Sequence, residues 1–279
     1  MSKALAAAFA GVALATVPAE ACELGLPAKV QQGSLLIGTA PKGTEVDVAG
    51  RKVRVSADGR FLVGVGRDEI KPTHVAAKLL DGRTLACAVE IEKRQYKIQR
   101  IDGLPKKQVS PSAEDMTRIK VEQQAINKVR WLNSASVDFL AGFQWPLTGR
   151  ISGVYGSQRV LNGEPRRPHL GVDIAAPAGT PILAPAPGTV ALVHPDMFFT
   201  GKSVMLDHGH GLTSFYVHMS AISVKQGQRL ERGQEIGKVG QTGRATGPHL
   251  HWGVALFSTQ LDPALLAGKM PEDKGKAKP

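Results

Sequence analysis

The residues best suited to chemistry are histidines in the second half of the chain. Every histidine except His74 lies beyond residue 140. His169 and Asp173 stand four positions apart in PHLGVDIAAPAGTP. His249 and His251 stand two positions apart in GPHLHWGV. The prolines and glycines around the first pair disfavour a helix. In extended strands, side chains two or four positions apart share a face, so two strands can bring these imidazoles and the carboxylate together.

Imidazoles combined with a carboxylate are typical ligands of catalytic zinc, because three protein ligands leave one coordination position open. Water bound at that position has its pKa lowered to about 7, so hydroxide forms without a strong base. The chain has no HExxH sequence, so it lacks the glutamate base of that class of zinc peptidase. Other histidines would therefore have to transfer the protons.

A further group of histidines lies in SVMLDHGHGLTSFYVHMS, residues 203–220. The stretch 207–211 is typical of a hairpin turn. On the return strand, His218 is expected to share a face with three alternate residues: Leu212, Ser214 and Tyr216. His208 and His210 repeat the two-apart spacing, but their aspartate and glycine neighbours favour a solvated turn. We therefore expect neither of these two to bind metal.

Together these segments resemble the lysostaphin-type zinc metallopeptidases, which cleave peptide bonds in bacterial peptidoglycan. The resemblance covers residues 143–265 and rests on motifs in the family's order: FQWPLTGRISGVYG, PHLGVDIAAPAGTPILAPAPGTV, VMLDHGHGLTSFYVHMS, VKQGQRLERGQEIGKVGQTG and TGPHLHWGV. It implies an antiparallel β catalytic domain over these residues, within a chain that is mainly β.

The resemblance also implies a role for five residues. The family's metal ligands fall on His169, Asp173 and His251, which would hold one Zn²⁺ per chain. Its catalytic histidines fall on His218 and His249. The implied function is a zinc metalloendopeptidase that hydrolyses peptide bonds in the stem peptides or cross-links of peptidoglycan.

Three other interpretations compete. A biotinyl or lipoyl carrier domain would account for APAPGTV and VKQGQRLERGQEIGKVG, but no lysine lies between Gly188 and Thr200 to carry the cofactor. A structural zinc site would leave two histidines unused. The main alternative is a catalytically silent relative that binds cell-wall material or regulates another hydrolase. Such relatives lose ligands, whereas this chain keeps all five residues.

The elements before the catalytic domain would position it. Residues 22–100 alternate β-prone runs with turn signals such as Asp58-Gly59 and Asp81-Gly82. They predict a small β-sandwich without a cluster of chemical residues.

Residues 101–142 are expected to form a linker and a helix. The linker, IDGLPKKQVSP, carries proline and glycine, and Ser112 with Asp115 resembles a capping box. The helix at about 113–132 has a narrow apolar stripe at helical spacing: Met116, Ile119, Ile126 and Val129. We expect the stripe to pack on a neighbouring domain, where the helix would lie across the catalytic groove. Residues 266–279 are short and charged at the end, which predicts a disordered tail.

The first 21 residues resemble an export signal, with Lys3, an apolar stretch and an A-x-A cleavage site. No later stretch is long and apolar enough to span a membrane. Cys22 would then begin the mature chain, either lipid-anchored or in a disulfide with Cys87. The even cysteine count favours the disulfide. The expected location is the periplasm or cell envelope.

Composition agrees with this class of protein. The chain has 279 residues, 42% hydrophobic and 21% charged, enough for two ordinary domains with cores of their own. Its net charge is +11, yet neither domain has a basic run interleaved with aromatic residues, so nucleic-acid binding has little support. A positive charge would suit an anionic polymer such as the cell wall.

Overall fold

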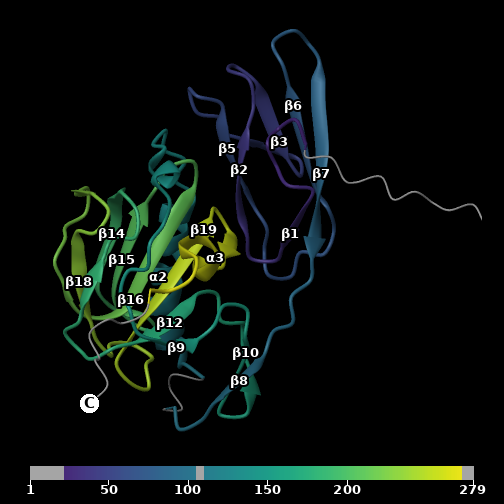
Figure 1. The fold of residues 1–279 in the computed structure, drawn as a ribbon. Coiled ribbons are helices and arrows are strands. Elements are labelled where there is room, and N and C mark those ends of the chain that lie inside the picture. Colours follow the sequence, from purple (N-terminus) through teal and green to yellow (C-terminus); the bar gives the residue numbers. More distant parts are fainter. Residues whose placement is uncertain (1–21, 105–109, 272–279) are drawn as a thin grey trace, which may run out of the picture.

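The computed structural model describes residues 22–104 and 110–271. The predicted signal peptide therefore lies outside the described residues. The described part is mainly β, as the sequence predicts, with a small N-terminal domain beside a larger domain, the predicted catalytic domain (Figure 1). No helix among the described residues is long and apolar enough to cross a membrane.

The N-terminal domain is a two-layer β structure. Its strands are β1 (Lys29–Gln31), β2 (Leu35–Thr39), β3 (Glu45–Val48), β4 (Arg51–Val53), β5 (Arg60–Gly64), β6 (Thr73–Lys78) and β7 (Thr84–Glu92). One layer is a five-stranded sheet in the order β1-β7-β6-β3-β4, and the other is the β2-β5 pair. Phe61 from one layer and Val75 from the other meet in a shared core. This arrangement agrees with the predicted sandwich.

The two predicted Asp-Gly turns differ in what they connect. Asp81-Gly82 joins β6 to β7, which pair as a hairpin, as predicted. Asp58-Gly59 leads from β4 to β5, which lie in different sheets, so it is a turn but not a hairpin. Glycine is favoured at position 59 because its φ is +76° and a Cβ there would lie 1.9 Å from a backbone oxygen.

A disulfide between Cys22 and Cys87 is present, which confirms the pairing expected from the sequence. It joins the start of the described chain to β7, with the two cysteines 65 positions apart. Closing a loop of this length stabilises the folded state by about 4 kcal/mol in the chain-entropy model.

The catalytic domain is built on a 10-stranded sheet with antiparallel pairing along the path β17-β14-β15-β16-β19-β12-β9. These strands are β9 (Arg150–Gly153), β12 (Val172–Ala175), β14 (Gly188–Met197), β15 (Gly201–Asp207), β16 (Leu212–Ile222), β17 (Arg229–Leu230) and β19 (His249–Leu256). Three more lie off this path: β13 (Pro181–Leu183), β18 (Glu235–Val239) and β20 (Thr259–Leu261). Ile174, Tyr216 and Trp252 are fully buried in the core on one face of the sheet.

A small sheet connects the two domains. Strand β8 (Ile98–Ile101) pairs in parallel with β10 (Gln158–Leu161), which also pairs with β11 (Glu164–Pro165). The predicted linker therefore begins inside a strand that belongs to the catalytic domain's edge. Composition could not reveal this, because the partner strand lies 60 positions further along the chain.

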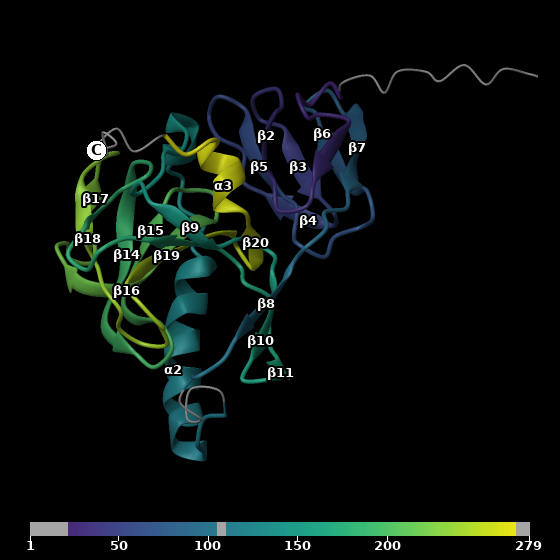
Figure 2. The same ribbon diagram turned by 60° about the horizontal axis from the view of Figure 1, so that its bottom comes forward.

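Helix α2 (Ala113–Arg130) follows, and its start carries the predicted capping box of Ser112 and Asp115. Ile126 and Val129 are buried against four residues of the catalytic domain: Met197, Met205, Phe215 and Val217. Met116 is 40% exposed, so only the C-terminal half of the predicted stripe packs. Figure 2 shows the N-terminal half of the helix projecting beyond the sheet.

Residues 266–271 are more ordered than the sequence predicts, and the rest of the predicted tail, 272–279, lies outside the described residues. A 3-10 helix, η1 (Asp138–Ala141), precedes the catalytic domain and α3 (Pro263–Ala267) ends it. The predicted disordered tail began at residue 266, but Leu266 packs against the core and Trp145 donates a hydrogen bond to the Gly268 carbonyl. These apolar and indole contacts come from distant segments, so a local charge pattern does not indicate them.

Candidate metal centre

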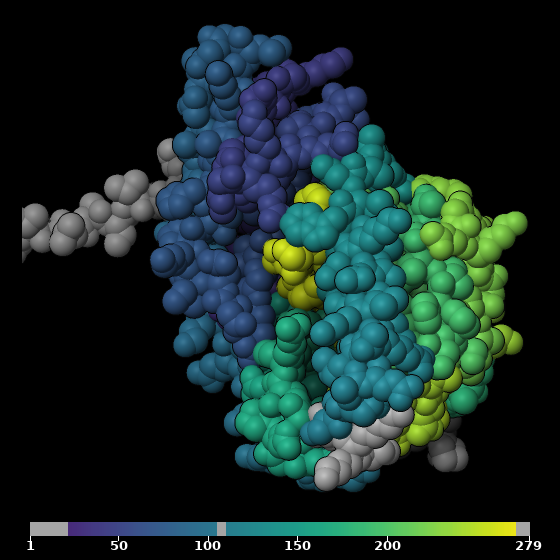
Figure 3. Space-filling model, turned by 180° about the vertical axis from the view of Figure 1, so that it is seen from behind, coloured from purple at the N-terminus to yellow at the C-terminus, as the bar shows by residue number. Residues whose placement is uncertain are grey.

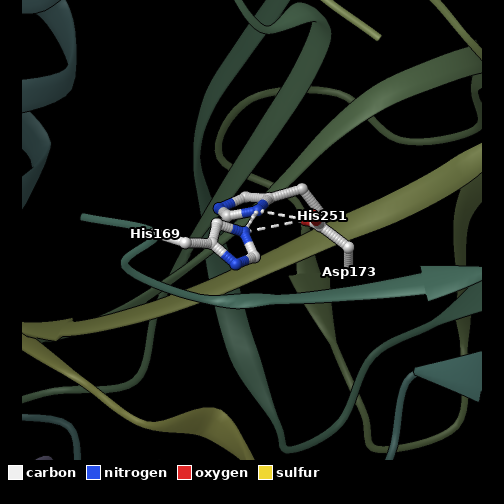
Figure 4. Close-up of side chains that lie close together, drawn as sticks. All are labelled: His169, Asp173 and His251. Carbon is white, nitrogen blue, oxygen red and sulfur yellow. Dashed lines mark hydrogen bonds and ion pairs between the residues drawn. The ribbon is translucent and has the colours of Figure 1, made fainter. Parts of the chain in front are cut away.

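Three of the predicted site residues come together on neighbouring strands. Asp173 of β12 lies directly opposite His251 of β19 in the antiparallel register. His169 precedes β12, and its backbone is fixed by hydrogen bonds to Ser157 and Gly156. The register of two strands that are far apart in sequence therefore places a carboxylate and an imidazole side by side, and the loop before β12 adds a second imidazole (Figure 4).

The ligand atoms form a small triangle. His169 Nε2 lies 2.8 Å from His251 Nδ1, and each of these lies within 2.9 Å of Asp173 Oδ1. In a tetrahedral zinc site with bonds of 2.0–2.1 Å, ligand atoms stand about 3.3 Å apart. The triangle is thus close to the size that such an ion requires.

The protonation of the rings also fits a metal. His169 Nδ1 lies 3.2 Å from the Val154 carbonyl and donates to it, so the Nε2 lone pair of the neutral ring points into the triangle. Burial lowers the pKa of His169 to about 4, which keeps that ring neutral. Burial opposes ionisation of Asp173, but hydrogen bonding to His169 and His251 holds its pKa well below the usual value.

Glycines leave the space that the triangle needs. A Cβ at Gly153 would lie 2.3 Å from Asp173 Oδ2, and one at Gly171 would lie 2.7 Å from His251 Cε1. Any larger residue at either position would push a ligand side chain aside.

Two more histidines lie beside the triangle without joining it. His249 Nδ1 bonds to the Gly247 carbonyl and His218 Nδ1 to the Thr242 carbonyl, each at 2.8 Å. Their ring centroids are 4.7 Å apart, and His249 Nε2 is 4.0 Å from Asp173 Oδ1. In both rings the Nδ1–H donates to a carbonyl, so Nε2 keeps a free lone pair.

The placement of His218 corrects the sequence prediction. Strict alternation would place His218 on the same face as Tyr216, as predicted. Tyr216 lies in the core, and Val217, on the other face, is the residue opposite His251. His218 would then point into the core. His218 instead has φ +63° beside an irregular stretch of β16, which turns its ring towards the site. Such a conformation is uncommon for a residue other than glycine and clusters at functional sites. Burial, with His249 and His251 nearby, lowers the pKa of His218 to about 3.

The prediction of a solvated turn for His208 and His210 is wrong. Their exposed fractions are 0% and 3%, because the segment after α2 covers the turn. His208 bonds to the Pro187 carbonyl at 2.6 Å and to Ser214 Oγ at 2.7 Å. His210 donates its backbone N–H to Ser134, and burial lowers its ring pKa to about 4. Neither lies in the cluster of His169, Asp173 and His251.

Arg159 is a site residue that the sequence did not indicate. Its Nη2 donates to Asp173 Oδ2 at 3.0 Å, so the two carboxylate oxygens have separate partners. Arg159 thus orients the carboxylate and leaves Oδ1 for the histidines. An arginine in RVLNGEPRR has no distinguishing signal, because its role depends on a partner 14 positions away.

Helix α2 lies on the same sheet face as the metal centre. Phe215 and Val217, which support α2, stand opposite Gly253 and His251 in the sheet register. Gln123 and Arg130 of the helix line one cavity together with His251. Figure 3 shows the helix across this surface, beside the β10–β11 hairpin. The helix therefore borders the cavity on the side of His169 and His251, and its role in access to the site stays a prediction.

Comparisons with known proteins give a consistent result. Residues 167–263 match the family model described as Peptidase family M23. The peptidoglycan DD-endopeptidase ShyA of Vibrio cholerae is 43% identical over 102 residues, covering 33% of this chain and 23% of ShyA. The DD-carboxypeptidase/endopeptidase Mpg of Neisseria meningitidis is 38% identical over 123 residues, covering 44% of this chain and 28% of Mpg. The chain spans about a quarter of the length of these curated relatives.

A solved structure extends the similarity beyond the catalytic domain. A crystal structure from Pseudomonas aeruginosa, described as a candidate M23 peptidase, is 32% identical with a TM-score of 0.66. The match covers 85% of this chain and 94% of that chain.

Proposed function

The chain belongs to peptidase family M23, and from this premise we propose that it is a zinc-dependent endopeptidase that hydrolyses peptide bonds in bacterial peptidoglycan. The names of its relatives ShyA and Mpg support the substrate class. The observation that carries the proposal is the triangle of His169, Asp173 and His251, flanked by two histidines with free Nε2 lone pairs.

His169, Asp173 and His251 would hold one zinc ion through the atoms that face one another. Zinc bound there would supply Lewis acidity to the scissile carbonyl and lower the pKa of a water molecule to about 7. Arg159 would keep Asp173 oriented through the second carboxylate oxygen.

His218 and His249 would transfer the protons. Both can accept a proton at Nε2, because Nδ1 is occupied by a backbone carbonyl. In hydrolysis, the water oxygen adds to the carbonyl carbon and one water proton passes to a histidine. The C–N bond then breaks as a proton is returned to the departing amine. Water is thus divided between a carboxyl group and an amine, and the histidines end as they began.

A catalytically silent relative remains the second interpretation, and the site does not favour it. All five side chains are present. Three of the histidines lie 2.8 to 4.0 Å from Asp173 Oδ1, and the His218 ring lies 4.7 Å from the His249 ring. A protein that only binds cell-wall material would not require two further histidines with their rings fixed.

We also propose that the protein works outside the cytoplasm, in the periplasm or cell envelope. Peptidoglycan lies there, and the Cys22–Cys87 disulfide is typical of an oxidising compartment.

Incubation with intact peptidoglycan tests the function. Zinc-loaded mature protein should release peptide fragments that mass spectrometry identifies by a newly formed amine and carboxylate. A chelator should stop the release, and added zinc should restore it. Unchanged peptidoglycan with the zinc-loaded protein would contradict the proposal.

A further inference from the structure

Helix α2 carries two arginines that differ in their partners. Arg118, in the first half of the helix, forms ion pairs with the carboxylates of Glu122 and Asp196. Arg130, the last residue of the helix, donates one hydrogen bond, from Nη2 to Gln260 Oε1 at 3.4 Å. The Nε atom of Arg130 is buried and has no hydrogen-bond partner in the described part of the chain.

The pKa values of the two arginines reflect this difference. Burial lowers the pKa of the Arg130 guanidinium, and no carboxylate of the described residues opposes that shift. The hydrogen bond to Glu122, in contrast, raises the pKa of Arg118. A guanidinium stays protonated in proteins, so Arg130 is a cation that is removed from water without a compensating charge. A buried cation of this kind is costly, and a bound anion would lower the cost.

Arg130 lines a cavity of about 430 Å³ between α2 and the catalytic sheet, under the helix seen in Figure 3. Two further arginines line this cavity, Arg159 and Arg167, and no carboxylate is among its described lining residues. Arg159 is engaged with Asp173 Oδ2, and Arg167 is exposed. Arg130 is therefore the lining arginine that is partly buried and has no carboxylate partner.

A second polar atom of the cavity wall also lacks a partner. Thr213 is 1% exposed, and its hydroxyl makes no hydrogen bond among the described residues. In the sheet register, Thr213 lies opposite Ala255, which in turn lies opposite Gln260. Residues paired in this way point to the same face of a sheet. The Thr213 hydroxyl and the Gln260 side chain that Arg130 contacts thus flank the small side chain of Ala255.

This end of the cavity is separate from the metal centre. Ala255 and His251 are four positions apart on β19, which corresponds to about 13 Å at about 3.3 Å per residue. Arg130 also lies outside the residues that match the family model. Arg130 and Thr213 take no part in the hydrolysis proposed above, so a site between them would be an additional one.

The directions of the two donors indicate which ligand would suit them. Arg130 approaches from the helix and Thr213 from the sheet. Both can donate to a negatively charged oxygen, and such hydrogen bonds are stronger than those between neutral groups. A carboxylate accepts hydrogen bonds mainly within one plane. The oxygens of a tetrahedral anion point in four directions, so one anion of that shape can accept from both elements.

We propose that this cavity binds a phosphate-like oxyanion between Arg130 of α2 and Thr213 of β16, and that the bound anion ties the helix to the sheet. The inference goes beyond the proposed function and does not depend on it. The anion would add a polar contact to a helix that packs on the sheet through two buried apolar residues, Ile126 and Val129.

Binding of inorganic phosphate to the full chain in chelator, at constant ionic strength, tests the proposal. Titration calorimetry should show saturable binding, with acetate bound at least about tenfold more weakly. Arg130→Gln should weaken phosphate binding by about 10- to 100-fold, the range expected for hydrogen bonds to a charged group. Thr213→Val keeps the side-chain shape and should weaken it by about tenfold. Lys128→Gln, which removes a charge from an exposed position of the same helix, should stay within about twofold of the wild type.

Hydrogen exchange tests whether the anion holds the helix. Phosphate at about ten times its dissociation constant should slow amide exchange in the C-terminal half of α2 by about tenfold, because the bound anion stabilises the docked helix by mass action. The same phosphate concentration should leave this exchange unchanged in Arg130→Gln. Unchanged exchange in the wild type with phosphate bound would overturn the proposal.

Three binding results would also contradict the proposal. The first is that the wild type binds no phosphate, or binds acetate as tightly. The second is that phosphate binding survives Thr213→Val, which decides the matter if Arg130→Gln does not fold. The third is that binding is lost in His251→Ala but retained in Arg130→Gln, which would place the anion at the ligand triangle instead.

Discussion

One face of the catalytic sheet has two contrasting halves. In one half, β12 and β19 place Asp173 opposite His251, with ligand atoms 2.8 Å apart and little exposure. In the other half, α2 covers the sheet through only two buried apolar residues, Ile126 and Val129. Val121 on the same helix is 62% exposed.

The first half holds the groups that would carry out the chemistry, and the second half would control access to them. A shift of one position between β12 and β19 would turn the ligands into the core, so their register is strongly specified. Helix α2 depends on a few polar contacts as well, such as the Glu122 carboxylate that accepts the Phe198 N–H at 2.9 Å. Elements with few buried contacts open at low free-energy cost. We infer that the metal centre is rigid and that α2 can be displaced.

The largest effect should come from removing a ligand of the rigid half. Asp173→Ala takes away the carboxylate that contacts both ligand imidazoles, so bound zinc and turnover should both fall below detection. Metal analysis and a peptidoglycan assay measure the two quantities. Asp81→Ala, in an exposed turn of the N-terminal domain, is the matched control and should retain both. Full zinc content in Asp173→Ala would exclude the carboxylate as a ligand.

A smaller effect is expected where the ligands stay intact. His218→Asn keeps a residue that tolerates the φ of +63° but removes the imidazole. Zinc should stay bound while turnover falls by about 10²- to 10⁴-fold, the usual contribution of an acid-base group. The exposed His74 gives the control, His74→Asn. Wild-type turnover in His218→Asn would show that this ring transfers no proton.

Loosening α2 should raise activity rather than lower it. Ile126→Ala combined with Val129→Ala truncates both buried apolar side chains of the helix, whose burial is worth about 1.5–3 kcal/mol each. Hydrolysis of intact peptidoglycan should then increase about tenfold. Met116→Ala, at a 40% exposed position of the helix, should leave the rate unchanged.

A truncated chain that begins at Ala141 should likewise be at least as active, provided that it folds and binds zinc. Loss of activity with zinc retained, in the truncated chain or in the double variant, would mean that the N-terminal region positions the substrate. Autoinhibition by α2 would then be wrong.

The smallest effect on catalysis should come from a buried histidine outside the site. His208→Ala leaves the Pro187 carbonyl and the Ser214 hydroxyl short of a partner. Each loss should lower the free energy of unfolding by about 1–3 kcal/mol. Thermal melting should show the drop, while turnover per folded molecule at 25 °C stays within about twofold of wild type. A large loss of turnover would assign His208 a catalytic role.

Much of the fold and of the candidate site could be predicted from the sequence, because the sequence patterns that indicate these features are local. The alternation of β-prone runs, the capping box at Ser112 and the spacing of His249 and His251 each depend on neighbours within a few positions. The even cysteine count likewise led to the correct disulfide.

The features that the sequence did not predict depend on residues that are distant in sequence. Arg159 gains its role only when β10 and β12 bring it to Asp173. The orientation of His218 follows from a positive φ that no residue type around it requires. His208 is buried because the segment that follows α2 covers its turn. The periodicity of apolar residues and the amino-acid composition carry no information on contacts between residues that are distant in sequence.

Zinc content and turnover, measured side by side in His249→Ala and His251→Ala, test the central claim most directly. The two residues are two positions apart on β19, yet only His251 joins the ligand triangle. His251→Ala should lose zinc and activity together. His249→Ala should keep about one zinc per chain while turnover falls by about 10²- to 10⁴-fold. Zinc lost from His249→Ala but retained in His251→Ala would contradict the account.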